Sequence, residues 1–434
     1  MRGQPAPPRE CADTTRKILL KLPTRDVTRC CCVSRLWRDV VADPTFRRLH
    51  AEAEAEADHV AAAPEALLVT ETREHGRSDE ASFSCISSSK PASMPHSIVI
   101  PSGYGLSNVC NGLLCFAHNT APMAPVLICN PVTGETATLP KPPPRWHKND
   151  HTEYHHIALG FSPSTKEYKL FRFSVSSNSD YETVIQQSVC TLGGGRDRWR
   201  RQSYISMCPL LHNSPPVLVD GKLYLMTSGR GHQQPRNRNS SEMLVVDVAT
   251  EEYHMHHLPV EDKGYYPDFD PQVKAFEMSG RLCLAVDIYH PHRKLQFWVF
   301  SPPAQYQRGE CDNKKLCWDL RHNFYTDGNR CSTLISVCFD DGEKMLCFRR
   351  GDILFKHDTR GCSLELSPEA DCEQCHQRLE LPPTPSNCKW NVFGGYRPSL
   401  LSPLTLATPL SLSYAEAERQ QFKHKLLLTL RRHE

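Results

Sequence analysis

The sequence has almost no net charge, because 51 basic residues are balanced by 49 acidic ones, which leaves a formal charge of +2. Such a chain lacks the global positive field that draws proteins to nucleic acid. It also lacks any run near the 18 apolar residues that a membrane-spanning helix needs. Residues 1–8 are polar and proline-rich, without the apolar core of a signal peptide. We therefore expect a soluble protein of the cytoplasm and/or nucleus, with neither membrane nor nucleic acid as a partner.

Catalytic and cofactor motifs are missing as well. The chain has no Gly-x-Ser-x-Gly elbow, no phosphate-binding Walker loop and no dinucleotide fingerprint. The triple glycine at 193–195 precedes a strand-like run, which favours a hairpin turn over a phosphate cradle. We expect no catalytic residue and no cofactor, so the chain is predicted not to be an enzyme.

Two clusters contain metal-ligating residue types, but neither has a specific spacing. The run Cys372-Glu-Gln-Cys375-His376 has the spacing of haem attachment, which belongs to secreted compartments. Cys362 and Cys388 could complete a zinc site with Cys372 and Cys375, although a second Cys-x-x-Cys pair is absent. The other cluster consists of His147, His151, Glu153, His155 and His156. We favour a cysteine-rich polar loop for the first cluster and a solvated loop for the second, and predict no metal.

Cysteine and proline are both abundant, with 20 and 34 residues. Disulfide frameworks are expected in short secreted chains, whereas a buried cysteine behaves as a small apolar residue. Six cysteines fall inside apolar strand-like runs: Cys115, Cys129, Cys190, Cys283, Cys338 and Cys347. We interpret most cysteines as reduced core residues. The prolines are typical of a loop-rich β protein.

Short helices are predicted near the N-terminus. A helix over 13–21 ends before Pro23, and Thr24 offers a hydroxyl cap for a helix through Cys31. Ser34 caps a further helix over 35–42, which ends at the Asp-Pro pair 43–44. Three such helices bury too little apolar surface to be stable alone. They are expected to dock onto another protein.

The residues of these predicted helices and of the turns between them resemble the second half of an F-box. The matching strings are Leu22-Pro23, residues 32–38 (Cys-Val-Ser-Arg-Leu-Trp-Arg) and residues 43–46 (Asp-Pro-Thr-Phe). They are similar to plant (grass-type) F-box proteins that have a β-rich associated domain. The resemblance implies that the helices bind a Skp-type adaptor and, through it, a cullin. The rest of the chain would recruit a target protein for ubiquitination.

The resemblance places the adaptor contact on six residues, namely Ile18, Leu19, Leu22, Pro23, Val33 and Trp37. The first half of the box departs from the family. Glu10-Cys11 stands where the family has Leu-Pro, and Thr14-Thr15 stands where it has apolar residues. Each large apolar side chain lost from such a contact costs about 1–3 kcal/mol. The adaptor contact is therefore expected to be weakened.

A repeating pattern begins near residue 100. Asn111-Gly112, Asp220-Gly221, Ser279-Gly280 and Asp341-Gly342 are turn signals that each precede an apolar run. A further unit starts at Ile157. Repeats of some 50 residues with several short strands predict propeller blades of the kelch type. We count five units and expect a sixth drawn from both ends of the region.

Five strings in this region also resemble the F-box associated domain of the same plant family: residues 110–115, 129–134, 159–169, 199–200 and 395–400. That domain is β-propeller-like and binds the target. The predicted fold is therefore an α+β multidomain chain in four parts. These are a helical F-box at 10–50, a helical and flexible linker at 51–99, a mainly-β kelch-like propeller at 100–402 and a C-terminal helical tail at 403–434.

Several alternatives remain open at this point. The helix predicted over 414–433 lies on the propeller, or else binds a partner through its apolar face. Arg196, Arg198, Arg200 and Arg201 surround Trp199 and form either a solvated blade edge or a contact for acid or RNA. The protein as a whole is a ligase receptor, a stand-alone propeller with a decayed F-box, or, less favoured, a propeller enzyme. The sequence does not identify the target.

Overall fold

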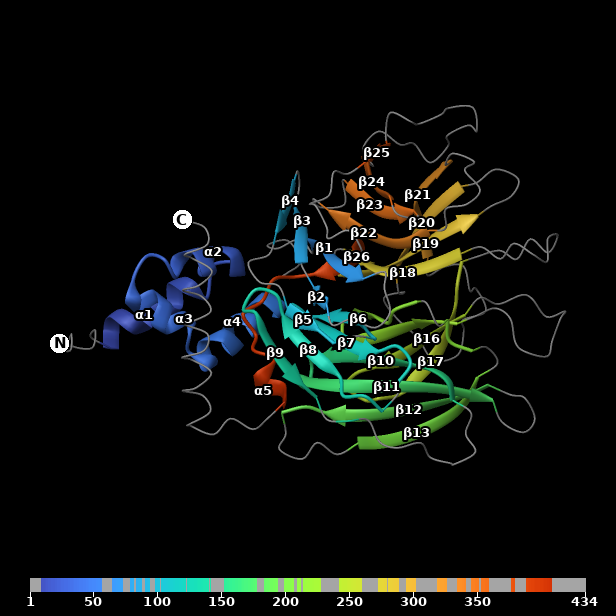
Figure 1. The fold of residues 1–434 in the computed structure, drawn as a ribbon, viewed down its shortest axis with the longest axis horizontal. Helices are drawn as coiled ribbons and strands as arrows, with labels where there is room; N and C mark the ends of the chain where they lie inside the picture. Colours follow the sequence, from blue (N-terminus) through green and yellow to red (C-terminus); the bar gives the residue numbers. More distant parts are fainter. Residues whose placement is uncertain are drawn as a thin grey trace.

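The computed structural model describes ten stretches of the chain, apart from short gaps inside several of them. They are residues 9–56, 65–72, 79–141, 152–227, 242–259, 272–301, 318–325, 334–358, 376–378 and 388–407. Four helices come first, and almost everything after them is antiparallel sheet. Figure 1 shows the helices projecting from one end of the group of sheets.

The N-terminal helices are α1 (Arg9–Leu19), α2 (Thr24–Cys30), α3 (Arg35–Val41) and α4 (Pro44–Glu56). We call this unit, residues 9–56, the hook. Ser34 caps α3 as predicted, since its hydroxyl accepts a hydrogen bond from the Trp37 amide at 3.3 Å. The predicted cap by Thr24 is wrong, because Thr24 is the first residue inside α2. Its amide and hydroxyl instead donate to the carboxylate of Glu54, at 2.8 and 2.6 Å.

The linker expected over 51–99 differs from the structure at both ends. The Ala-Glu repeat is the last part of α4, and Ala51 packs against the core of the first sheets rather than facing only solvent. Further on lie β1 (Glu65–Thr72), β2 (Asp79–Ala81), β3 (Phe83–Ser87), β4 (Lys90–Ser93) and β5 (Ile98–Ile100). The partner of β1 lies more than 300 residues away in the sequence, so no local pattern shows this pairing.

Five four-stranded antiparallel sheets follow each other along the chain. The first contains β6 (Tyr104–Cys110), β7 (Leu113–His118), β8 (Leu127–Asn130) and β9 (Glu135–Thr138), and the second β10 (Thr152–Ser162), β11 (Glu167–Ser177), β12 (Thr183–Thr191) and β13 (Trp199–Ser206). The third contains β14 (Val217–Val219), β15 (Lys222–Met226), β16 (Glu242–Asp247) and β17 (Tyr253–His257), and the fourth β18 (Gln272–Met278), β19 (Arg281–Ile288), β20 (Lys294–Phe300) and β21 (Trp318–Tyr325). The fifth contains β22 (Leu334–Asp340), β23 (Met345–Arg350), β24 (Ile353–Asp358) and β25 (His376–Arg378).

A sixth sheet joins the two ends of the β region. Its strand order is β26-β1-β3-β4, where β26 (Cys388–Tyr396) pairs antiparallel with β1. The sixth unit therefore draws on the C-terminal end of the predicted region 100–402, as expected, but its other three strands lie in the segment predicted as a linker. The short strands β2 and β5 form a separate two-stranded ribbon. Strand β6 contacts both β10 and β26, and β18 contacts both β14 and β22.

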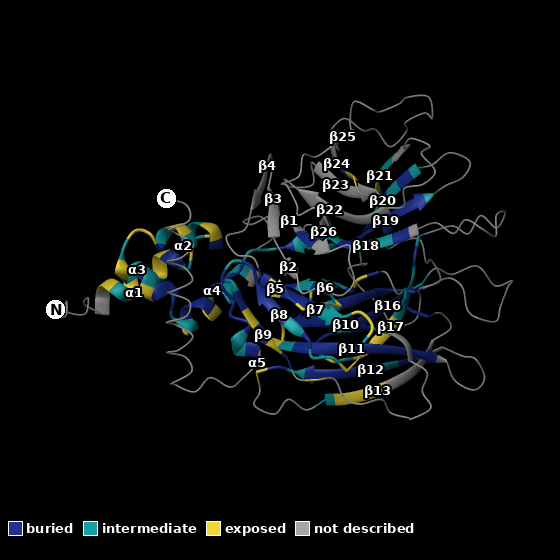
Figure 2. Cartoon of the chain, in the orientation of Figure 1, coloured by how far each residue is buried: buried dark blue, intermediate teal, exposed yellow. Residues whose placement is uncertain are grey.

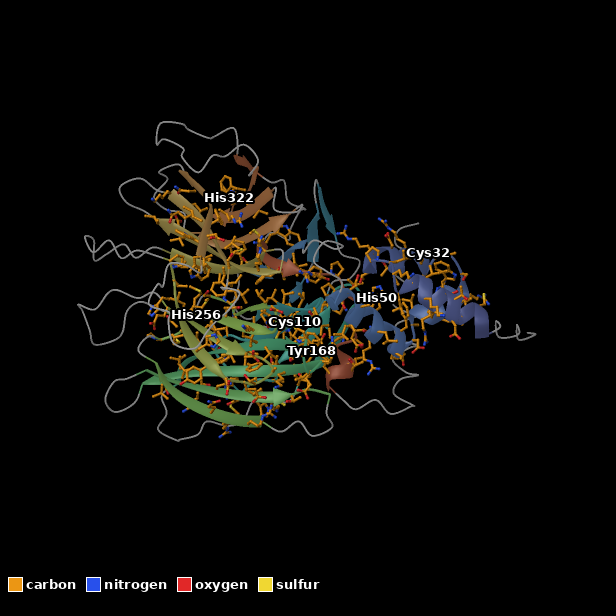
Figure 3. All side chains as sticks on the ribbon, turned by 180° about the vertical axis from the view of Figure 1, so that it is seen from behind. Cys32, His50, Cys110, Tyr168, His256 and His322 are labelled. Atoms are coloured by element: carbon orange, nitrogen blue, oxygen red, sulfur yellow. The ribbon has the colours of Figure 1, made fainter. Side chains whose placement is uncertain are left out.

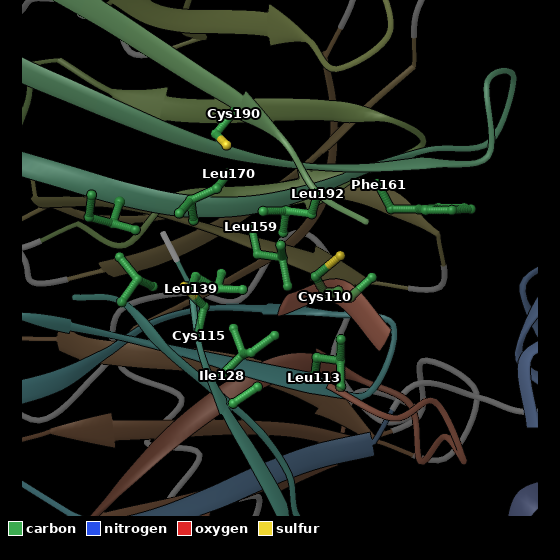
Figure 4. Close-up of a cluster of buried hydrophobic side chains, with 14 of the residues drawn as sticks. Cys110, Leu113, Cys115, Ile128, Leu139, Leu159, Phe161, Leu170, Cys190 and Leu192 are labelled. Atoms are coloured by element: carbon green, nitrogen blue, oxygen red, sulfur yellow. The ribbon is translucent and has the colours of Figure 1, made fainter. Parts of the chain in front are cut away.

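Neighbouring sheets share their cores because successive residues of a strand point to opposite faces. Leu170 lies in the cluster between the first and second sheets (Figure 4), while Phe171 lies in the next cluster, between the second and third. Burial on both faces explains the continuous apolar runs, which Figure 2 shows as dark blue strands. Cys115, Cys129, Cys190 and Cys283 are buried free thiols, as predicted.

The predicted turns are confirmed where the structure describes them. Asn111 and Gly112 have φ values of 48° and 78°, and Asp220 and Gly221 have 45° and 69°. Both pairs thus occupy the positive-φ conformation of a tight hairpin turn. The pair at 341–342 and the helix predicted over 414–433 lie outside the described residues. The C-terminal helix that is described, α5 (Leu404–Ala407), has four residues.

Candidate interaction site on the helical hook

The hook is built around one apolar core to which all four helices contribute. Its fully or largely buried members are Leu19, Val27, Cys31, Val40, Val41, Ala42, Phe46 and, from the far end of the chain, Leu400. Leu19 has no exposed surface. A side chain in that position supports the helices and offers no area to a partner, in contrast to the contact expected from the sequence.

The other residues expected at the adaptor contact keep exposed surface. Ile18 is 46% exposed and Val33 is 67% exposed, which is high for apolar side chains, and Pro23 is exposed too. Leu22 and Trp37 are half-buried and pack against the hook core. Figure 2 shows exposed yellow segments on α1–α3. The arrangement can therefore bind an apolar partner surface.

Polar contacts fix the turn that contains Leu22 and Pro23. A ring nitrogen of the buried His50, labelled in Figure 3, lies 2.8 Å from the backbone oxygen of Leu22. Glu54 holds the first residue of α2, and Arg16 on α1 forms a 2.7 Å ion pair with Asp43. These contacts join α1 to the residue before α4, the turn to the middle of α4, and α2 to the last turn of α4, so the exposed residues sit on a braced frame.

Two of the three consecutive cysteines of the hook, Cys30 and Cys31, have raised pKa values. Burial, helped by neighbouring Cys32 and Cys30, raises the pKa of the Cys31 thiol to about 12. Burial and the charge of Asp26 also raise the pKa of Cys30. Both thiols therefore stay protonated at neutral pH, and an uncharged thiol is a poor nucleophile.

The hook is joined firmly to the sheets, which no local sequence pattern indicates. Arg47 of α4 is 1% exposed and binds Glu135 of β9, which is fully buried, through two contacts of 2.5 and 3.1 Å. Arg47 also donates from Nε to the backbone oxygen of Leu400 at 2.7 Å. Thr133 donates to the same carboxylate at 3.0 Å. Arg47, a charged residue for which the sequence alone suggests an exposed helix position, thus lies at the centre of the interface between the hook and the sheets.

The chain returns to this interface after β26. We call residues 397–402 the return segment. The side-chain amide of Asn130 donates to the backbone oxygens of Ser399 and Leu401, both at 2.8 Å. Asn130 itself accepts from the amide of Val132, which packs against the hook core. The hook, the turn between β8 and β9 and the return segment therefore meet in one buried network.

The predicted basic patch around Trp199 is only partly a free surface. Arg200 binds Glu251 and also donates to Thr191 at 2.9 Å, while Glu251 accepts from the buried Lys169 at 2.9 Å. Burial opposes ionisation of Glu251, but the hydrogen bonds from Arg200 and Lys169 prevail, so its pKa is lowered. Arg200 thus ties the second sheet to the third. Arg196 and Arg198 lie outside the described residues.

The structure describes only part of the predicted histidine cluster. His155 and His156 lie in strand β10, where His156 is buried, so the solvated loop expected for them is wrong. Cys362, Cys372 and Cys375 lie outside the described residues, as do His147 and His151. Within the described stretches, no group of three or more His, Cys, Asp or Glu side chains could hold a metal ion. No described helix is long and apolar enough to cross a membrane.

Family models match both parts of the chain. A model described as an F-box associated beta propeller domain matches residues 60–348, and a model described as an F-box domain matches residues 12–49. The first part of α4 lies in the F-box match, and the propeller match begins shortly after α4 ends. The first match thus includes β1, which the sequence reasoning had placed in a linker.

Curated relatives come from Arabidopsis thaliana. The F-box protein DOR is 23% identical over 313 residues, which cover 68% of this chain and 71% of that protein. The F-box protein At1g53790 is 25% identical over 301 residues, covering 66% of this chain and 60% of that one. The chain spans about half to seven tenths of the length of the first relatives it matches.

Solved structures resemble the chain only weakly. A prolyl endopeptidase structure has a TM-score of 0.33 at 12% identity, over 80% of this chain and 45% of that one. The WD40 domain of SCAP from fission yeast has a TM-score of 0.32 at 9% identity, over 79% and 98% of the two chains. Scores this low support no argument about function.

Proposed function

The chain belongs to the family of F-box proteins with an F-box associated beta propeller domain, and from this premise we propose that it is the substrate-recognition subunit of a Skp-cullin-F-box (SCF) ubiquitin ligase. In this role the hook binds a Skp-type adaptor, and through it a cullin. The β region binds a target protein. The chain itself performs no covalent chemistry, and it acts in the cytoplasm and/or nucleus by holding the target near the ubiquitin-charged enzyme.

The observation that supports the adaptor contact is the exposure of apolar side chains on a braced frame. Ile18 and Val33 expose apolar surface at 46% and 67%, although the hook has its own core in which to bury such residues. Apolar residues that stay exposed beside half-buried aromatic ones are typical of an interface centre. We therefore assign the contact to Ile18, Pro23, Val33 and the exposed edge of Trp37.

The β region supports the target-binding role through its architecture. We propose that the six sheets are the blades of a propeller and that β26 closes the ring by pairing with β1. Closure protects sheet edges that would otherwise pair with other chains. Because both faces of the blades are occupied by core, target recognition is left to the connecting loops at the two ends of the blades.

Binding to a purified plant Skp-type adaptor tests the proposal. We expect the full chain to bind in a pull-down and in titration calorimetry. Ile18→Asp and Val33→Asp should each weaken binding by roughly tenfold or more, because a carboxylate at an apolar contact must lose its water. Leu49→Asp is the matched control. Leu49 is also an exposed apolar residue of the hook, at 36%, but it lies outside the proposed contact.

The outcome separates the remaining interpretations. The polar departures of the box are compatible with folding, since the buried Thr15 hydroxyl donates to the backbone oxygen of Cys11 at 2.8 Å within α1. Failure of the wild-type chain to bind, with its circular dichroism intact, would leave a stand-alone propeller with a decayed F-box. Equal loss in all three variants would refute the assigned contact while retaining the receptor role.

A further inference from the structure

We infer that the adaptor-binding hook is completed by the return segment, so that adaptor binding depends on the far end of the β region being folded. The inference rests on the proposed function. Its central observation is that Leu400 is fully buried in the hook core, beside helices that precede it by more than 340 residues.

The hook core is small, so the loss of the Leu400 side chain should destabilise it. Four short helices provide only a handful of buried apolar side chains, and units of this size rarely hold a fixed structure unaided. Leu400 packs in the same cluster as Leu19 and Phe46, which position the exposed Ile18 on α1 and the start of α4. Removing that side chain leaves a cavity between the helices that carry the adaptor contact.

The position of Leu400 is set by the β region and not by the hook. Tyr396, the last residue of β26 before the return segment, is fully buried in the cluster shared by the sixth and first sheets. The amide of Asn130 then holds the backbone on both sides of Leu400, and Leu401 enters the core of the first two sheets. Successive residues of the return segment thus fill two different cores.

Arg47 makes the hook depend on the first sheet as well as on the return segment. Its guanidinium binds Glu135 of the first sheet while its Nε binds the backbone oxygen of Leu400. These contacts of Arg47 form only when β9 and the return segment are both in place. A chain whose synthesis stops before residue 400 has the sequence of the hook but lacks the side chain that fills its core, and it should not occupy the adaptor.

Two adjacent leucines provide a matched test in the full chain. Leu400→Ala removes apolar volume from the hook core, and Leu401→Ala removes the same volume from the core of the sheets. We expect Leu400→Ala to weaken adaptor affinity at least about tenfold, because a smaller fraction of molecules presents an ordered hook. Leu401→Ala should change it less than about twofold, and Leu400→Met should retain near wild-type affinity because it conserves volume.

A second readout does not require the adaptor. Hydrogen exchange of residues 9–56 should become faster in Leu400→Ala than in Leu401→Ala, because the first variant also opens the hook locally, whereas the second acts only through global unfolding. If Leu400→Ala loses its β signal in circular dichroism, Leu400→Val replaces it. Wild-type affinity together with wild-type exchange in the Leu400 variants, or equal effects of the two alanines, would overturn the inference. Lack of adaptor binding by the wild type, with faster hook exchange in Leu400→Ala, would refute the proposed function alone.

Discussion

Arg47 and Glu135 show how much depends on a single buried pair. Both side chains have lost their water, and each is held by the other and by further hydrogen bonds. Removing one charge leaves its partner buried and unpaired, which typically costs about 3–5 kcal/mol. We expect Glu135→Gln to lower the free energy of unfolding by about that amount in urea denaturation.

The double variant Arg47→Met/Glu135→Leu provides the comparison, because it removes both charges and leaves neither unpaired. Its loss of stability should be smaller than the sum of the two single losses. Arg29→Met, at an exposed ion pair with Asp26, should change stability little. A Glu135→Gln variant as stable as the wild type would show that the Arg47–Glu135 pair does not hold the hook to the sheets.

His256 on β17 makes the fold sensitive to acid. Burial, together with the positive charges of His254, Lys222 and His257, lowers the pKa of His256 to about 4, and its ring packs on Phe300. In the unfolded chain the pKa of this histidine is about 6.5. Between these values the unfolded state binds a proton that the folded state does not, so the contribution of His256 to stability is lost as the pH falls from about 6.5 to 4.

His256→Gln should therefore flatten the fall in unfolding free energy over this pH window, as measured by urea midpoints at about pH 7, 5.5 and 4.5. Lys222→Gln should flatten it in part, because removing a nearby positive charge raises the pKa of His256 in the folded state. Slopes identical to that of the wild type in both variants would contradict this assignment.

At the scale of the elements, the hairpin turn between β6 and β7 leaves no room for a side chain at Gly112, because the return segment packs against it. Gly112 has a φ of 78°, and a Cβ there would lie 2.6 Å from the backbone oxygen of Arg397. Gly193 has a similar φ of 76°, but its nearest neighbour, the oxygen of Thr405, would lie at 3.5 Å. The two glycines thus share a backbone strain and differ in the space around them.

We expect Gly193→Ala to cost about 1–2 kcal/mol from the positive φ alone. Gly112→Ala should cost a further roughly 1–3 kcal/mol, because the return segment must move to admit the methyl group. Thermal and urea unfolding of both variants measure the difference. Equal losses would mean that the return segment yields freely, which would also weaken its assigned role in the hook.

The sequence predicted elements that depend on neighbours in the chain and missed those that depend on distant partners. The cap at Ser34 and the hairpin at Asn111 and Gly112 are fixed by residues within a few positions, so their patterns were sufficient. Glu54 capping α2 and the pairing of β1 with β26 join segments far apart, which no local signal records. At the candidate site, exposure of Ile18 and burial of adjacent Leu19 were settled only by tertiary packing.

Over the whole molecule, each described boundary between parts is a shared core. Clusters join the first sheet to the second, the second to the third, the third to the fourth, and the sixth back to the first. Phe355 of the fifth sheet packs on the core of the fourth, and Leu400 links the hook to the return segment. Parts that share side chains cannot lose one core without exposing the next.

We therefore expect the hook and the sheets to unfold in one cooperative transition. Phe171→Ala empties part of the core between the second and third sheets and should cost about 3–5 kcal/mol. Its effect should appear equally in the hydrogen exchange of α3 and of β1, both far from the substitution, and in the far-ultraviolet dichroism. If α3 kept its wild-type protection while the second sheet lost its own, the hook would be an independent unit, and the shared position of Leu400 would not couple them.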